Sequence, residues 1–94
     1  MLSPELEAAL LVEVRFGYRT RNRDLFDDAL QSPVFVLSDH ATRLGQWHQA
    51  TRTLEISRRL VLERTWPEVM GVLEHEMAHQ FVDEVMVVRG ERCV

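Results

Sequence analysis

The sequence predicts an α+β fold, in which a small three-stranded sheet packs on an N-terminal helix and on a C-terminal helix. Three observations predict it. Residues 5–16 follow a helix start signal, residues 34–57 contain three short runs typical of strands, and residues 66–88 have apolar side chains at helical spacing. At 94 residues, the chain has room for one domain with a single modest core.

The N-terminal helix has a clear start signal. Ser3 is a good N-cap, Pro4 suits the first helical position, and Glu5 places an acid in the first turn. We expect this helix to end near Gly17. The following stretch NRDLFDDAL, residues 22–30, predicts a short second helix or a turn.

Three strands are predicted in the middle of the chain. The run VFVLS (34–38) is continuously β-branched or aromatic apart from its last residues, which is typical of a buried strand. RLGQWH (43–48) and RTLEIS (52–57) predict two shorter strands, joined by a turn near residues 49–52.

The last of these strands alternates in polarity. Leu54 and Ile56 are apolar, whereas Thr53, Glu55 and Ser57 are polar. Side chains of a strand point alternately to its two faces. We therefore expect Leu54 and Ile56 to face the core and the three polar residues to face water.

The C-terminal helix is the best-marked element. Thr65 as N-cap and Glu68 at the third helical position form a capping box. Gly90 is a reasonable stop signal. One side of the helix is apolar, and we expect it to pack in the core: Met70, Leu73, Met77, Phe81, Val85 and Val88.

Composition and charge argue against several classes of protein. A formal charge of -4 disfavours a general nucleic-acid binder, which is usually basic. No segment approaches ~20 uninterrupted apolar residues, so we expect no membrane span. No basic stretch precedes an apolar run at the start, so we expect no secretion signal. The single cysteine, Cys93, suits a reducing compartment, and we expect a cytoplasmic protein.

The stretch LEHEMAHQF, residues 73–81, carries the candidate chemistry at the edge of this apolar face. Positions i and i+4 of a helix are neighbours, so His75 and His79 can each aim a ring nitrogen at one zinc ion. Glu76 lies about 100° around the helix from His75, beside the metal and outside its ligand set. There it can act as general base on the attacking water. Two core or surface histidines without a metal are the alternative interpretation.

A zinc site needs further ligands. Asp83 lies eight residues from His75, about 12 Å along the helix axis. We interpret it as a solvated acid, with a bond to His79 as the alternative. Valines at positions 82 and 85 exclude the compact metzincin arrangement, which needs Gly and His there. The remaining candidates for a third ligand are Glu91, Cys93, His40 and His48.

A resemblance to a known family covers most of the chain. The sequence resembles a SprT-like zinc metalloprotease domain, also found in Spartan-type proteases, over about residues 33–91. Four features carry the resemblance in order. They are the strand VFVLS, a Leu-Gly-aromatic segment (Leu44, Gly45, Trp47), an Ile-x-Ile-Ser-like strand that here is LEIS, and a helix with His-Glu-x-x-His.

This resemblance implies a zincin-like fold and a function. By similarity, His75 and His79 are zinc ligands, and Glu76 is the catalytic acid/base that hydrolyses peptide bonds of a polypeptide substrate. The family takes its third ligand from a histidine soon after this helix, whereas residues 89–94 here are RGERCV. We therefore expect residues 1–94 to be one SprT-like domain that is incomplete at its C-terminus.

A polypeptide substrate is expected to lie along a sheet edge. In zincins an edge strand above the cleft holds the substrate backbone, and residues 43–48 or 52–57 would supply it by strand addition. Trp47 and Trp66 are expected to be packing residues, one in the hairpin and the other at the start of the last helix.

Two other functions are alternatives. The first is a non-catalytic remnant of the zincin fold that acts as a protein-interaction module. The second is DNA contact through basic residues near the end of the first helix, which would fit the DNA-linked role of some relatives. The acidic balance of the chain and the aspartates among these arginines favour a salt-bridged surface. The residues concerned are Arg15, Arg19, Arg21 and Arg23, with Asp24, Asp27 and Asp28.

Overall fold

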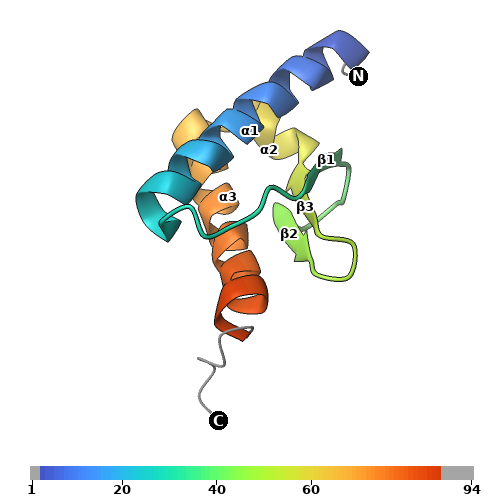
Figure 1. Ribbon diagram of the computed structural model, residues 1–94. Helices are drawn as coiled ribbons and strands as arrows, with labels where there is room; N and C mark the ends of the chain where they lie inside the picture. Colours follow the sequence, from blue (N-terminus) through green and yellow to red (C-terminus); the bar gives the residue numbers. More distant parts are fainter. Residues whose placement is uncertain (1–2, 88–94) are drawn as a thin grey trace.

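The computed structural model describes residues 3–87 and confirms the predicted α+β fold. Helices pack against one face of a three-stranded sheet, and the long first helix crosses the helix that carries the histidine motif (Figure 1). The elements follow in the order α1 (Pro4–Phe26), β1 (Val34–Ser38), β2 (Gly45–His48), β3 (Thr53–Ser57), α2 (Arg58–Glu63), α3 (Trp66–Phe81) and the π-helical turn η1 (Val82–Met86).

Helix α1 begins as predicted but extends further. Ser3 Oγ accepts a hydrogen bond from the Leu6 N–H at 3.1 Å. The prediction that the helix ends near Gly17 is wrong, because it continues to Phe26. Gly17 is buried, and a Cβ placed there would lie 2.6 Å from the sulfur of Met70 on α3. This glycine therefore permits close contact between two helices and does not end the first one.

The stretch 22–30 forms the end of α1 and the turn that follows it. Asp27 and Asp28 have φ angles of 59° and 57°, in the left-handed region that aspartate tolerates better than most residues. The buried Asn22 side chain holds the turn. Its Nδ2 donates to the Leu30 carbonyl at 2.8 Å, and its Oδ1 accepts from the Leu30 N–H at 3.1 Å. These bonds lead the chain back toward the sheet.

The sheet has the strand order β1-β3-β2. β1 pairs in parallel with β3, with Val34 opposite Thr53. β2 pairs antiparallel with β3, with Gly45 opposite Ile56, and residues 49–52 form the predicted turn between them. β3 is thus the central strand, and β2 lies at an edge.

Strand β3 is buried on both faces, which corrects the predicted alternation. Leu54 and Ile56 lie in the core, at 0% and 1% exposure. Glu55 and Ser57 were expected to face water, but they are 6% and 4% exposed. A central strand has neighbours on both sides, and their side chains can cover its outer face.

Helix α2, which the sequence analysis does not predict, starts directly after β3. Ser57 is its N-cap, and the Ser57 Oγ accepts from the Leu60 N–H at 3.2 Å. Leu60 is 2% exposed and joins the core. The short helix therefore connects the central strand to α3.

Helix α3 has the predicted capping box. The Glu68 N–H donates to Thr65 Oγ1 at 3.4 Å, and the Thr65 N–H donates to Glu68 Oε1 at 3.3 Å. Four residues of the predicted apolar side are buried and Phe81 is partly buried, whereas Val88 and the predicted stop Gly90 lie outside the described residues. The four buried residues are Met70, Leu73, Met77 and Val85.

The core lies between α1, α3 and one face of the sheet. Its most deeply buried apolar members come from all three: Val14, Tyr18, Leu54, Ile56, Val69, Leu73 and Met77. This packing fixes α3 against β2 and so positions the histidine motif. Within residues 3–87, no helix is both long enough and apolar enough to cross a membrane.

Candidate metal centre

His75 and His79 lie side by side on the exposed side of α3. Their Nε2 atoms are 3.3 Å apart, and their ring centres are 4.9 Å apart with the planes at 80°. Two Zn–N bonds of about 2.0–2.1 Å at a tetrahedral angle place the two nitrogens about 3.3–3.4 Å apart. The pair therefore fits two corners of a tetrahedral zinc site.

Glu76 faces the sheet beside this pair. It is 7% exposed, and its Oε1 accepts from the backbone N–H of Trp47 on β2 at 3.1 Å. Within residues 3–87, its Oε2 has no hydrogen-bond partner, and Glu76 also lines a pocket with His75. One carboxylate oxygen thus fixes the side chain, while the other stays free to accept a proton.

Gly45 lets β2 approach α3 closely at this point. A Cβ at Gly45 would lie 2.8 Å from Val72 Cγ1 and 3.3 Å from Glu76 Cγ. It would also lie 3.2 Å from the Glu55 carbonyl oxygen. A side chain here would push the edge strand away from the motif helix, so the glycine contributes to the position of Glu76.

Trp47 has a larger part in the site than packing. Its side chain is buried, and its indole Nε1–H donates to Asp83 Oδ2 at 2.9 Å. Asp83 is half-buried, so it is solvated only in part, and in the described part of the chain its carboxylate bonds to Trp47 and not to His79. Because its backbone N–H also bonds to Glu76, Trp47 joins β2 to α3 and to η1. The sequence carries no local signal for these contacts, since the partners are 29 and 36 residues apart.

The other two histidines lie elsewhere. His40 Nδ1 accepts from the N–H groups of Thr42 and Arg43, at 3.3 and 3.2 Å. His48 Nε2 lies 2.8 Å from Glu55 Oε1. Across residues 3–87, no three His, Cys, Asp or Glu side chains gather around one potential metal position. The candidates Glu91 and Cys93 lie outside the described residues.

The buried Glu55 is the centre of a polar cluster that the sequence analysis missed. Arg43 donates to both carboxylate oxygens at 3.1 Å, and Ser38 Oγ donates to Oε2 at 2.8 Å. The hydrogen bonds from Arg43, with smaller contributions from His48 and Ser38, lower the pKa of Glu55 to about 2 against the opposing effect of its burial. The carboxylate is therefore ionised at neutral pH. No local pattern marks this cluster, because its members come from three strands and a loop.

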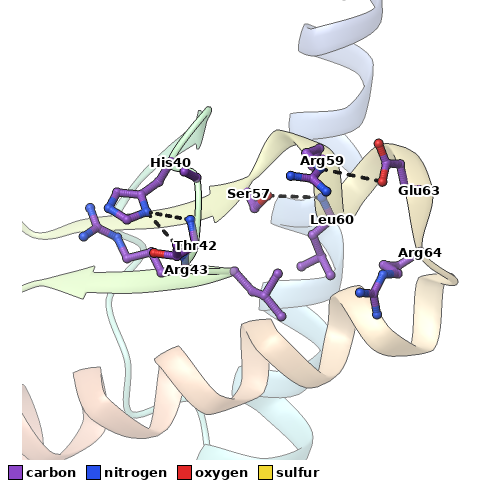
Figure 2. A pocket seen from close by; sticks show the side chains of 10 residues that line it. His40, Thr42, Arg43, Ser57, Arg59, Leu60, Glu63 and Arg64 are labelled. Carbon is purple, nitrogen blue, oxygen red and sulfur yellow. Dashed lines mark hydrogen bonds and ion pairs between the residues drawn. The ribbon is translucent and has the colours of Figure 1, made fainter.

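Two adjoining pockets flank the start of β2, and Leu44, Leu60 and Arg64 line both. The larger, of about 500 Å³, extends to His75 and Glu76. The smaller, of about 200 Å³, is polar and is drawn in Figure 2, where the labelled side chains include His40, Arg59 and Glu63. The larger pocket is therefore the one that adjoins the histidine motif.

The arginines near the end of α1 are partly neutralised. Arg23 pairs with Asp24 at 2.9 Å, as the salt-bridged interpretation expects. Arg21 instead reaches α3, where its Nε lies 2.8 Å from Glu74 Oε2. These two pairs support a salt-bridged surface over a phosphate-binding one.

Comparisons with known proteins give no match: no family model, no curated protein and no solved structure matches this chain.

Proposed function

We propose that this chain is a zinc-dependent peptide hydrolase of SprT-like type that acts on polypeptides in the cytoplasm. His75 and His79 are zinc ligands, and Glu76 is the general base. The observation that carries the proposal is the 3.3 Å separation of the two Nε2 atoms on one helix. The carboxylate of Glu76 on the same helix is held by a hydrogen bond from strand β2.

Zinc held by this pair would polarise the attacking water and the scissile carbonyl group. Glu76 Oε2 would accept the proton of the attacking water, and the same carboxyl group would later give a proton to the leaving amine. The bond from the Trp47 N–H keeps Glu76 in place during both transfers. General acid–base help of this kind typically contributes about 10²–10⁴-fold to the rate.

The sheet topology narrows the choice of the strand that holds the substrate. Of the two strands expected to do so, β3 has both neighbours in place, whereas β2 is an edge strand. The Ser57 N–H on β3 donates to the Leu44 carbonyl, so the backbone groups of Leu44 face β3. In an antiparallel pair, the backbone N–H and C=O groups of successive residues point alternately toward the partner strand and away from it. The backbone groups of Gly45 and Trp47 therefore point away from β3, toward the free edge of the sheet. Trp47 already bonds to Glu76 and to the Gln46 side chain. Gly45 is therefore the position where β2 can take a peptide backbone.

Zinc titration and proteolysis test the proposal together. A catalytic zinc normally has three protein ligands, and residues 3–87 offer two, so we expect the 94-residue chain to bind zinc weakly. His75→Ala and His79→Ala should abolish that binding, as measured by competition with a chromophoric chelator. Cleavage of an unfolded protein should depend on added zinc.

Tight binding of one zinc per chain would instead mean that another residue completes the site. Loss of that affinity in Glu91→Gln or in Cys93→Ser would identify the ligand. If neither zinc binding nor cleavage is found, the non-catalytic interaction module becomes the better account of this fold.

A further inference from the structure

Gln80 is a fully buried polar residue that directly follows His79 on the motif helix. Its side chain is 0% exposed and forms hydrogen bonds in three directions. Its Oε1 accepts from the Tyr18 hydroxyl at 2.8 Å. Its Nε2 donates to the Gln31 carbonyl and to Glu84 Oε1, both at 2.9 Å. One side chain thus joins α3 to α1, to the loop before β1 and to η1.

An ion pair extends these contacts to the turn between β2 and β3. Arg52 in this turn donates to both carboxylate oxygens of Glu84, to Oε1 at 2.8 Å. It also donates to the Gln31 carbonyl at 3.1 Å. Glu84 and the Gln31 carbonyl therefore each bond to both Arg52 and Gln80. We call this cluster the Gln80 network, and its members are Tyr18, Gln31, Arg52, Gln80 and Glu84.

The Gln80 network spans the point where α3 changes into the π-helical turn η1. The turn begins at Val82, whose N–H donates to the carbonyls of both Ala78 and His79. Gln80 lies before this change and Glu84 lies after it. A π-helical turn departs from the regular α-helical bonding pattern, so those bonds alone do not set the rotation of the chain here. The network adds bonds from three other segments, and these hold both sides of the change in place.

The direction of the two motif histidines depends on how the buried side of α3 is held. His75 and His79 are exposed, so the core does not fix their rings directly. Gln80 lies on the buried side, next in sequence to His79. Hydrogen bonds are directional and apolar contacts are not, so a fully satisfied buried network fixes one rotation of a helix better than apolar packing does. When Gln80 is held inward, His79 is turned outward beside His75.

We propose that Gln80 is a positioning residue for the histidine pair. Its network fixes the rotation of the last turn of α3 and so keeps the Nε2 atoms of His75 and His79 at a separation that suits zinc. Tyr18 is its partner in the core. Burial raises the pKa of Tyr18 to about 12, so its hydroxyl is a neutral donor at physiological pH. This inference rests on the proposed zinc site and adds to it two residues outside the His-Glu-x-x-His motif.

Zinc affinity tests this role without any measurement of catalysis. Gln80→Met keeps the length of the side chain and a good helix propensity but removes the three hydrogen bonds. Apparent affinity scales with the fraction of molecules in the binding-competent arrangement, and we expect a loss of about tenfold by competition with a chromophoric chelator. Tyr18→Phe removes one bond, keeps the ring against Phe35 and should give a smaller loss in the same direction.

Asn22→Leu is the matched control for a loss of stability alone. It removes another buried amide, whose two bonds stay within residues 22–30. Its zinc affinity should equal that of wild type when both are measured at a temperature where they are folded. Unchanged affinity in Gln80→Met, or in Tyr18→Phe if the first variant does not fold, overturns the proposal. An equal loss in Asn22→Leu also overturns it, because affinity would then follow overall stability.

NMR of the metal-free protein separates this positioning from the zinc chemistry. The ring centres of His75 and His79 are 4.9 Å apart, so their ring protons should give a mutual NOE in wild type. The NOE should weaken in Gln80→Met and persist in Asn22→Leu. This result in a protein that binds no zinc would refute the hydrolase but support the positioning of the pair. An NOE of wild-type strength in both Gln80→Met and Tyr18→Phe overturns the positioning role even if the protein is a zinc hydrolase.

Discussion

The backbone N–H of Trp47 donates to Oε1 of Glu76 at 3.1 Å, and this bond joins the edge strand of the sheet to the middle of the motif helix. Its consequence is that the candidate general base is fixed by the sheet and not by its own helix. Glu76 also lines the pocket to which His75 contributes.

Replacing Glu76 with Gln should separate chemistry from structure. Gln can still accept the Trp47 N–H through its carbonyl oxygen, but it cannot take a proton from water. We expect Glu76→Gln to keep the fold and any bound zinc and to lose proteolysis by about two orders of magnitude or more. Cleavage of an unfolded protein and zinc content are measured on the same samples.

His75→Ala is the matched control for Glu76→Gln, since it should lose both zinc and activity. Near wild-type cleavage by Glu76→Gln would show that the hydrolytic mechanism is wrong. Loss of zinc together with activity would mean that Glu76 supports the metal site directly.

The two glycines near the pocket should respond in opposite ways to a methyl group. Gly45→Ala places a Cβ 2.8 Å from Val72 and 3.2 Å from the Glu55 carbonyl, and overpacking of this kind typically costs about 1–3 kcal/mol. Gly71→Ala has open space and gains helix propensity, so it should stabilise by about 0.5–1 kcal/mol. Urea unfolding of both variants measures the difference. Equal changes in the free energy of unfolding would mean that Gly45 on β2 is not in close contact with α3.

The indole N–H of Trp47 should contribute to stability through Asp83. Trp47→Phe keeps an aromatic ring but removes the donor to Asp83 Oδ2, and hydrogen bonds to charged groups contribute about 1.5–3 kcal/mol. We expect a loss in that range by urea unfolding. Trp66→Phe is the matched control, because Trp66 is 40% exposed and should change stability by less than about 0.5 kcal/mol. If the two variants lose the same amount, the Asp83 bond contributes little.

The Glu55 cluster should make stability depend on acid pH. The folded-state pKa of Glu55 is about 2, below the ordinary value of 4.5, so its ionised form stabilises the fold above pH 4.5. This contribution is lost as the pH falls from about 4.5 toward 2. Glu55→Gln should therefore be less stable than wild type at pH 7, and its Tm should fall less steeply between pH 5 and pH 2.

Thermal unfolding across this range checks the Glu55 assignment. Arg43→Gln removes the largest cause of the lowered pKa, so the acid-induced loss should be smaller than in wild type and should end at a higher pH. A Glu55→Gln variant with the same pH slope as wild type would contradict the role given to this carboxylate.

Local signals in the sequence determined most of the helices and strands and the proximity of the two motif histidines. Caps such as Ser3 and Thr65 act within three residues of their own helix, and the spacing of His75 and His79 fixes their proximity once the helix forms. These features depend on neighbours in the chain, so they can be predicted without knowledge of the fold.

Only the tertiary structure decided what surrounds those residues. The burial of Glu55 follows from the placement of β3 between two strands, which the polar alternation of that strand could not reveal. In the sequence, Gly17 has the character of a helix stop signal. In the structure, it allows α3 to pack closely against α1. The partner of Glu76 is a backbone group 29 residues away. Such contacts form between distant segments when the core assembles, and no short stretch of sequence encodes them.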